Sequence, residues 1–200
     1  MRVISGRFKG VALTTPKAGT RPTTDRTKEA IFSHLDSWGV LDDARVLDLF
    51  AGTGALGIEA LSRGARDLVA VESSAPAAAL IAQTLTALKH NRSWEHGMSA
   101  RVVKARAEKY AASASAVEPF DMVFIDPPYA FETNDCNQLL ADLASRELTS
   151  SNTVIMLERS TRSEAPAAPA NWEITDRRDY GETAVYYIEP SEPISDKGQH

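Results

Sequence analysis

Short apolar runs alternate with amphipathic stretches along most of the chain, a pattern typical of a sheet covered by helices. Five runs have the length and β-branched content of buried parallel strands. They are residues 45–50, 68–72, 101–104, 122–125 and 153–158. Two further runs, 172–174 and 183–188, lie close together in the sequence and predict an antiparallel member. We therefore expect an α/β fold built on a doubly wound, mostly parallel seven-stranded sheet.

Helical periodicity fills the intervals between these runs. Residues 25–39 place Ile31, Leu35 and Trp38 on one apolar face, and Thr24 is a suitable N-cap for this helix. Further helices are expected from residue 55 to about 63, from 76 to about 90, over 109–113, and around Leu139. The alternation of helices and strands indicates a Rossmann-like arrangement.

The two ends of the chain differ from this core. Residues 1–24 contain short apolar groups broken by glycine and proline, which is typical of an extended or hairpin-like arm. Such an arm must pack on the main body or become ordered on a ligand. Residues 190–200 form a polar tail that we expect to be disordered. We predict one domain over residues 1–189, with its core in residues 44–189.

Composition limits the class of protein. No apolar run approaches the roughly 20 residues of a membrane helix, and the first ten residues hold no apolar signal core, so we expect a cytoplasmic protein without membrane contact. The single cysteine, Cys136, excludes an internal disulfide and a cysteine-built zinc site. The four histidines show no ligand spacing, and we expect no metal.

Charge is distributed unevenly along the chain. The net charge of −5 argues weakly against a nucleic-acid partner. Residues 1–30, however, carry a local excess of five positive charges. A basic segment on an acidic body indicates a nucleic-acid footprint, although a solvated arm without a specific partner is the alternative.

A glycine-rich turn follows the first core run. Gly52, Gly54 and Gly57 match G-x-G-x-x-G, and Glu72 lies twenty residues past Gly52. In this strand–turn–helix context the pattern indicates a nucleoside-bearing cofactor, although a tight turn that merely needs glycine is the alternative. Asp48 interrupts the strand, and its carboxylate would repel a pyrophosphate but attract the ammonium of S-adenosylmethionine.

The stretch Asp126-Pro127-Pro128-Tyr129, a DPPY motif, follows the run 122–125. The prolines end the strand, so an acid, a carbonyl and an aromatic ring are held at the sheet edge where ligands bind. Asp126 and the Pro127 carbonyl would accept the two hydrogens of a planar amine, and Tyr129 would stack on its ring. These residues predict chemistry on the exocyclic amine of a nucleic-acid base, whereas simple packing of a turn is the alternative.

Several motifs together resemble a known family, the bacterial small-subunit ribosomal RNA guanine-N2 methyltransferases of the RsmD type. The resemblance covers roughly residues 1–189. The motifs that carry it are 2–6 (RVISG), 21–26 (RPTTDR), 48–57 (DLFAGTGALG), 59–64 (EALSRG), 126–129 (DPPY) and 180–183 (YGET).

The resemblance implies a class I methyltransferase that moves a methyl group from S-adenosylmethionine to the N2 amine of a guanine in 16S ribosomal RNA. S-adenosylhomocysteine would be the product. The substrate RNA would be part of a ribonucleoprotein particle, and the protein would act as a monomer. The alternatives are an amino-methyltransferase of DNA adenine N6 or of a protein glutamine amide, a nicotinamide-dependent oxidoreductase, and a non-catalytic RNA-binding module. The intact acid motif argues against the last.

The resemblance also implies residue roles. Asp126, Pro127, Pro128 and Tyr129 would hold the target guanine. The residues implied in cofactor binding are Asp48, Phe50, Ala51, Gly52, Thr53, Gly54, Gly57, Glu72, Arg106, Ala107, Thr23 and Thr24. The residues implied in contact with RNA are Arg2, Arg7, Lys9, Arg21 and Arg26. Arg106 departs from the family pattern, which often has Asp or Asn there to meet the adenine amine, so adenine recognition is left to backbone groups near Arg106 and Ala107.

Overall fold

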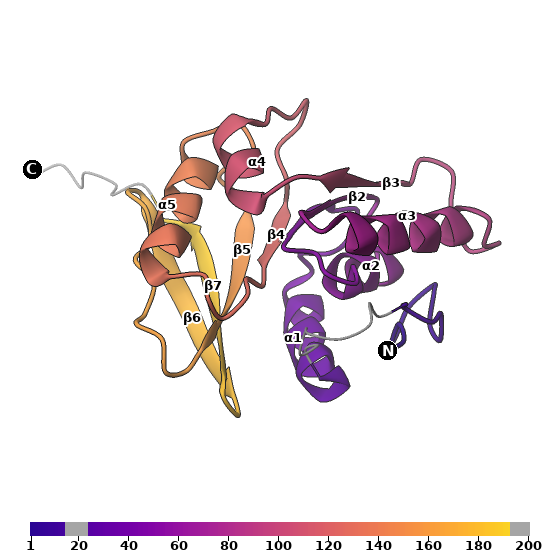
Figure 1. Cartoon of the computed structure of the whole chain (residues 1–200), viewed down its shortest axis with the longest axis horizontal. Coiled ribbons are helices and arrows are strands. Elements are labelled where there is room, and N and C mark those ends of the chain that lie inside the picture. The colour runs from indigo at the N-terminus through magenta and orange to yellow at the C-terminus, as the bar shows by residue number, and fades with distance from the viewer. Residues whose placement is uncertain (15–23, 193–200) are drawn as a thin grey trace, which may run out of the picture.

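The computed structural model describes residues 1–14 and 24–192. The strands of this part of the chain form one seven-stranded sheet in the order β3-β2-β1-β4-β5-β7-β6 (Figure 1). They are β1 (Arg45–Leu49), β2 (Asp67–Glu72), β3 (Ser99–Lys104), β4 (Met122–Ile125), β5 (Val154–Ser160), β6 (Trp172–Tyr180) and β7 (Thr183–Pro190). Strands β1 to β5 run parallel, whereas β7 pairs antiparallel with both β5 and β6. The predicted sheet is confirmed.

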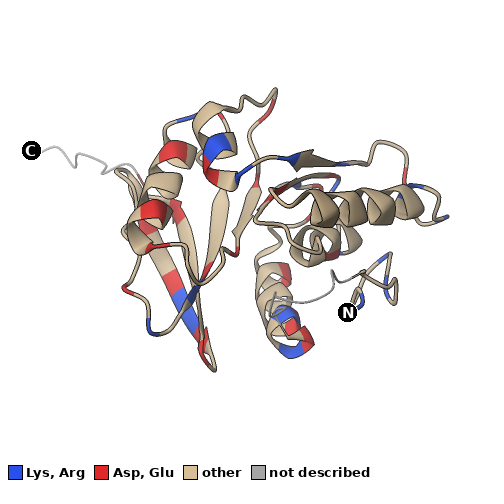
Figure 2. Ribbon diagram, viewed as in Figure 1, with Lys and Arg blue, Asp and Glu red and all other residues tan. Residues whose placement is uncertain are grey.

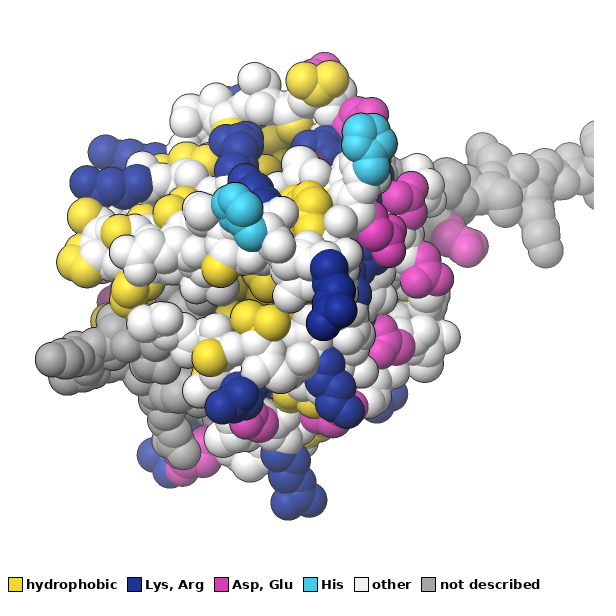
Figure 3. Space-filling view, turned by 90° about the vertical axis from the view of Figure 1, so that its right-hand side faces the viewer, with side chains coloured by type: hydrophobic (Ala, Val, Ile, Leu, Met, Phe, Trp, Pro, Cys, Tyr) yellow, Lys and Arg dark blue, Asp and Glu magenta, His cyan; other side chains and the backbone are white. Residues whose placement is uncertain are grey.

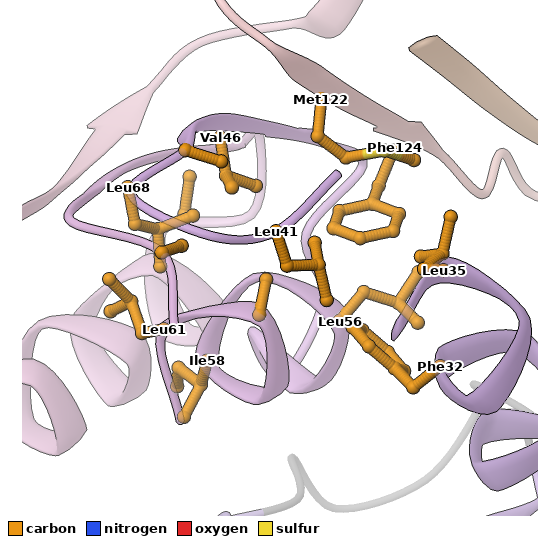
Figure 4. Packing of buried hydrophobic residues seen from close by; sticks show 14 of the residues in the cluster. Phe32, Leu35, Leu41, Val46, Leu56, Ile58, Leu61, Leu68, Met122 and Phe124 are labelled. Carbon is orange, nitrogen blue, oxygen red and sulfur yellow. The ribbon is translucent and has the colours of Figure 1, made fainter. Parts of the chain in front are cut away.

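Helices cover both faces of this sheet. They are α1 (Asp25–Trp38), α2 (Ala55–Ser62), α3 (Ala75–Lys89), α4 (Ala107–Ser113) and α5 (Thr133–Ala144). The first three pack on one face, where Phe32 and Ile58 share a buried cluster with Val46 and Phe124 of the sheet (Figure 4). Helices α4 and α5 share a second cluster with the opposite face. The doubly wound arrangement follows from this two-sided burial.

Trp38 and the strand β6 differ from their prediction. Trp38 is 39% exposed, while Ile31 and Leu35 are fully buried. Its ring instead lies 5.0 Å from that of Tyr187 on β7. Strand β6 extends well past Ile174, because an edge strand that is largely exposed needs no apolar alternation.

The arm at the N-terminus is a hairpin packed on the main body. The Val3 N–H donates to the Val11 carbonyl and the Gly10 N–H to the Val3 carbonyl, both at 2.9 Å. Val3, Phe8 and Leu13 are buried in the same cluster as α1 and α2. Of the two expectations for the arm, packing on the body is the one that the structure shows.

A buried charge cluster fastens this hairpin to the helices. The Glu59 carboxylate of α2 has no exposed surface and accepts hydrogen bonds from Ile4 N at 3.0 Å and Ser5 N at 3.1 Å. It also pairs with Lys28 Nζ of α1 at 3.3 Å and with Arg63 Nε at 3.0 Å. We call Lys28, Glu59, Ser62 and Arg63 the arm anchor.

Ser62 completes the arm anchor at the end of α2. Its Oγ accepts from Phe8 N at 2.9 Å and donates to Ser5 O, while its carbonyl accepts from Arg7 N at 2.8 Å. Gly6 approaches so closely that a Cβ there would lie 1.9 Å from the Ser62 carbonyl oxygen. The segment EALSRG therefore has a structural role that sequence reasoning did not assign.

Candidate active site

The predicted site lies at the carboxyl ends of β1 and β4, where the order of the strands in the sheet reverses. Strand β1 pairs with β2 on one side and with β4 on the other. The helices that follow β1 and β4 pack on opposite faces of the sheet. In open α/β sheets, ligands bind at such a reversal of the strand order, in the crevice outside the carboxyl ends of the strands. The glycine loop, residues 50–54, and the acid motif, residues 126–129, begin at this crevice.

The glycine loop has the backbone that its sequence predicts. Phe50, Gly52 and Gly54 all have positive φ, at 57°, 58° and 78°. A Cβ on Gly52 would meet only the Phe50 carbonyl oxygen, at 4.0 Å, so the space above this glycine is open. Gly54 is the N-cap of α2 and gives it no side-chain cap. The loop therefore exposes backbone to a ligand at a helix N-terminus.

Gly57 permits close packing of α2 on the sheet. Its N–H donates to Asp48 Oδ2 at 3.0 Å. A Cβ at this position would lie 2.5 Å from Leu68 Cδ1 and 3.0 Å from Asp48 Oδ2. The third glycine of the motif thus fixes the helix against β1 and β2 and holds the Asp48 carboxylate.

Asp48 is the most buried acid of the crevice, with 1% exposure. Burial raises the pKa of its carboxyl group well above the usual range, and the Gly57 N–H opposes this shift. The charges of Asp126 and Glu72 raise the pKa further, which brings three carboxylates into one electrostatic neighbourhood. Such a group favours a cationic ligand.

Glu72 links the end of β2 to the glycine loop. Its Oε2 accepts from Gly52 N at 2.7 Å and its Oε1 from Ser74 N at 2.8 Å. Both carboxylate oxygens keep further lone pairs that can accept from a ligand hydroxyl. The sequence pairing of Gly52 with Glu72 is a direct contact in the structure.

Arg106 and Ala107 lie at the start of α4, next along the same sheet edge. The Ala105 N–H donates to the Glu72 carbonyl at 3.2 Å, so this turn adjoins Glu72. The Arg106 side chain points to Glu108, with Nη2 and Oε1 2.6 Å apart, while Ala107 is buried. The backbone of this turn therefore adjoins Glu72 at the same edge of the sheet.

The aromatic ring of the acid motif, that of Tyr129, is exposed to solvent. Tyr129 is 74% exposed, while Asp126 is half-buried. The Phe131 N–H donates to the Pro128 carbonyl at 2.9 Å and closes the turn. The Phe131 ring then meets the Phe50 ring edge-on, with centroids 5.0 Å apart.

This Phe50–Phe131 contact joins the two halves of the crevice. Sequence reasoning did not assign Phe131 to the site, since only its position two residues past the motif marked it. A positive φ is unusual for a bulky residue such as Phe50, and such conformations cluster at functional sites.

The residues implied in RNA contact lie in two places. Arg26 is exposed in the first turn of α1, and Thr24 caps this helix by accepting from Thr27 N at 3.2 Å. Figure 2 shows basic and acidic positions next to one another at the lower end of α1. Arg21 and Thr23 lie outside the described residues. Arg7 and Lys9, by contrast, lie at the hairpin tip beside Ser62, at the end of α2 remote from the glycine loop.

The hairpin tip is part of a different surface. Phe8 stacks on Trp94 with centroids 6.1 Å apart, and Arg7 Nη1 lies 3.2 Å from Glu95 of the same loop. Arg2 is exposed and donates to the Gly10 carbonyl. Figure 3 views the molecule from the right-hand side of Figure 1, and it shows basic side chains and two histidines on this face. The structure therefore does not bring these arginines next to Asp126.

A hollow of the surface lies away from the crevice, between the hairpin tip and the ends of α1 and α2. Its charged lining includes Arg63 and Asp36, which already pair at 2.8 Å. Its lining contains none of the residues that the sequence implicated in cofactor binding or in holding the target base.

Three further observations concern the described part of the chain only. No group of three or more His, Cys, Asp or Glu side chains is placed there to hold a metal ion. None of the described helices is long and apolar enough to cross a membrane. Cys136 is buried, and burial raises the pKa of its thiol.

Comparisons with known proteins identify the family of the chain. Residues 1–189 match the family model described as conserved hypothetical protein 95. The chain is 33% identical over 185 residues to ribosomal RNA small subunit methyltransferase D of Escherichia coli, covering 92% of this chain and 87% of that protein.

Solved structures show the same fold. The structure of the Escherichia coli protein yhhF, described as a methyltransferase, superimposes on this chain with a TM-score of 0.81 at 32% identity. The match covers 96% of this chain and 98% of that one. Magnesium protoporphyrin IX methyltransferase from Synechocystis, solved with bound SAM, gives a TM-score of 0.62 over 86% of this chain and 87% of that one. At 14% identity this second likeness concerns the fold alone.

Proposed function

The chain belongs to the family of ribosomal RNA small subunit methyltransferase D, and from this premise we propose that it methylates the exocyclic N2 amine of a guanine in 16S ribosomal RNA. S-adenosylmethionine is the proposed donor. The observation that carries the proposal is the position of the acid motif at the same crevice as the Asp48–Gly52–Glu72 group.

The residues of the crevice fit S-adenosylmethionine. Asp48 offers a buried carboxylate for the methionine ammonium, and Glu72 offers acceptors for ribose hydroxyls. The open space above Gly52 leaves room for the cofactor along the glycine loop. A nicotinamide cofactor fits less well, because its pyrophosphate would enter a neighbourhood of three carboxylates.

The bound donor supplies a methyl group on a positively charged sulfur. Guanine N2 is a poor nucleophile because its lone pair is delocalised into the ring. Asp126 and the Pro127 carbonyl accept the two N2 hydrogens, which favours a pyramidal nitrogen and stabilises the positive charge that develops there. Tyr129, being exposed, stacks on the base and offsets part of the cost of removing it from its own stack.

The methyl group passes from the donor sulfur to N2 in a single displacement. A bond from N2 to the methyl carbon forms while the bond from that carbon to sulfur breaks, and sulfur keeps the electron pair. N2 then loses one proton, which Asp126 would accept and pass to water. In-line approach at about 3 Å is the geometry that the crevice must impose.

Amino-methylation of DNA adenine or of a glutamine amide remains the alternative, because all of these substrates present a planar amine. The name of the Escherichia coli relative favours ribosomal RNA of the small subunit. A methylation assay on RNA, DNA and protein separates the three.

The test uses labelled S-adenosylmethionine and small-subunit particles that lack this methylation. We expect label in RNA and N2-methylguanosine after nucleoside analysis. Asp126→Ala should reduce transfer at least 100-fold while cofactor affinity stays within a few-fold, and Glu147→Ala, an exposed acid beyond α5, is the matched control. Wild-type turnover in Asp126→Ala, or label in DNA or protein instead, would contradict the proposal.

A further inference from the structure

We propose that Glu158, at the carboxyl end of β5, is a second carboxylate that contacts the Watson–Crick edge of the target base and selects guanine over adenine. The inference rests on the proposed function and makes it more specific. No motif drew attention to Glu158 in the sequence, where it only ended an apolar run.

Strand register places Glu158 beside the acid motif. Strands β4 and β5 are parallel neighbours, and Ile125 pairs with Leu157. The next residues are Asp126, directly after β4, and Glu158, within β5, so the two acids come next to each other at the same edge of the sheet. Adjacent parallel strands lie about 4.8 Å apart, which is a suitable separation for two groups that contact one base.

Side-chain alternation places both acids on the same face. Phe124 and Met156 belong to the cluster under α1, and residues two positions further along a strand point to the same side. Asp126 and Glu158 are those residues. In agreement with this, the charge of Asp126 acts on Asp48 of the same face, and that of Glu158 acts on Tyr187 of β7.

Burial argues for a function of Glu158. It is 6% exposed on a strand whose preceding residues, Met156 and Leu157, are fully buried apolar side chains. A buried carboxylate costs free energy that an apolar residue in this position would not cost. A buried acid near the carboxyl edge of a parallel sheet, where ligands of such sheets bind, is therefore a candidate for a functional residue.

The chemistry of the two purines supplies the selection. Guanine has its N1–H donor next to its N2 amine, so Asp126 can accept from N2 while Glu158 accepts from N1. Adenine presents its N6 amine beside N1, which is an acceptor and would face the Glu158 carboxylate lone pairs. Sites that leave a buried polar group unpaired reject the wrong substrate strongly.

The experiment removes the N1–H donor of the substrate. Small-subunit particles are reconstituted with RNA that carries either guanosine or 2-aminopurine riboside at the methylated position. The analogue keeps the N2 amine but lacks both N1–H and O6, so the change in the substrate ratio between wild type and Glu158→Gln, and not the wild-type ratio alone, reports on the N1 contact. We expect the wild type to prefer guanosine at least tenfold in kcat/KM. Glu158→Gln should bring the two substrates within about threefold, because its amide can donate to N1 of 2-aminopurine. Glu173→Gln, an exposed acid on β6, should keep the wild-type ratio.

Each outcome decides the inference. Equal loss of kcat/KM on both substrates in Glu158→Gln would overturn it and make Glu158 a structural residue. A wild-type preference below about threefold would also overturn it, without any variant. Absence of N2-methylguanosine with the wild type and guanosine would instead refute the proposed function, and the inference with it.

Discussion

Lys28 Nζ and Glu59 Oε2 lie 3.3 Å apart, and neither side chain has any surface exposed to solvent. The pair joins α1 to α2, and Lys28 Nζ also donates to the Arg2 carbonyl at 3.0 Å. One ion pair therefore connects three segments that are distant in sequence: the arm, the helix preceding the sheet and the helix following the glycine loop.

Lys28→Met should destabilise the protein by about 3 kcal/mol, because removing one member of a buried pair leaves the other charge uncompensated. The value is at the low end for such a pair because Arg63 still contacts Glu59. Urea denaturation measures the change, with Lys89→Met on the exposed surface of α3 as control. Equal stability of Lys28→Met and Lys89→Met would contradict this role.

Asp48→Asn should stabilise the cofactor-free protein at pH 8 and weaken cofactor binding. Because burial raises the pKa of folded Asp48 above its unfolded value, the folded chain binds the proton more tightly. The stability from this group is therefore complete below the unfolded pKa and is lost as pH rises through the folded pKa.

An Asn at position 48 does not ionise, while its Oδ1 can still accept from Gly57 N. We expect the stability gain of Asp48→Asn over wild type to be larger at pH 8 than at pH 4, by urea denaturation at both pH values. Calorimetry with S-adenosylhomocysteine should show at least tenfold weaker binding. A gain that is independent of pH would refute the titration, and unchanged affinity would refute the ammonium contact.

Tyr129→Ala should separate stability from activity. With 74% of its surface exposed, Tyr129 contributes little to packing, so the free energy of unfolding should change by less than about 0.5 kcal/mol. Loss of base stacking, worth about 1–3 kcal/mol, should lower kcat/KM for RNA about tenfold or more. Tyr129→Phe keeps the ring and is the matched control. Equal activity of the two variants would exclude stacking.

Lys9 should contribute more than Arg7 to the salt dependence of RNA binding. Lys9 is exposed at the hairpin tip, whereas Arg7 already pairs with Glu95 at 3.2 Å. If Lys9 contacts a phosphate, Lys9→Ala should reduce the slope of log K against log salt by about 0.9. Arg7→Ala should reduce it less, and Lys109→Ala on α4 should not change it. A slope unaffected by Lys9→Ala would make the arm purely structural.

The sequence predicted the strands that form the interior of the sheet and the two loops at its crevice. Those strands are apolar on both faces, and the loops carry glycine or proline at fixed positions, so local signals suffice. Gly52 and Glu72 were paired through their spacing, and the structure shows them in contact at 2.7 Å.

The arm anchor could not be predicted in the same way. Lys28 and Glu59 have the appearance of ordinary surface charges on amphipathic helices, and the partners of Glu59 in the arm lie 54 and 55 residues away in sequence. Trp38 shows the reverse case, because helical spacing placed it in the core, whereas it is 39% exposed and packs edge-on against Tyr187 of β7. Burial of a polar group depends on the tertiary fold, which local periodicity does not describe.

The arm anchor has a consequence for synthesis of the chain on the ribosome. Residues 1–13 are translated before α2, so the hairpin cannot dock until residues 59–63 have been made and folded. The hairpin therefore docks only after the segment that carries the glycine loop has been made.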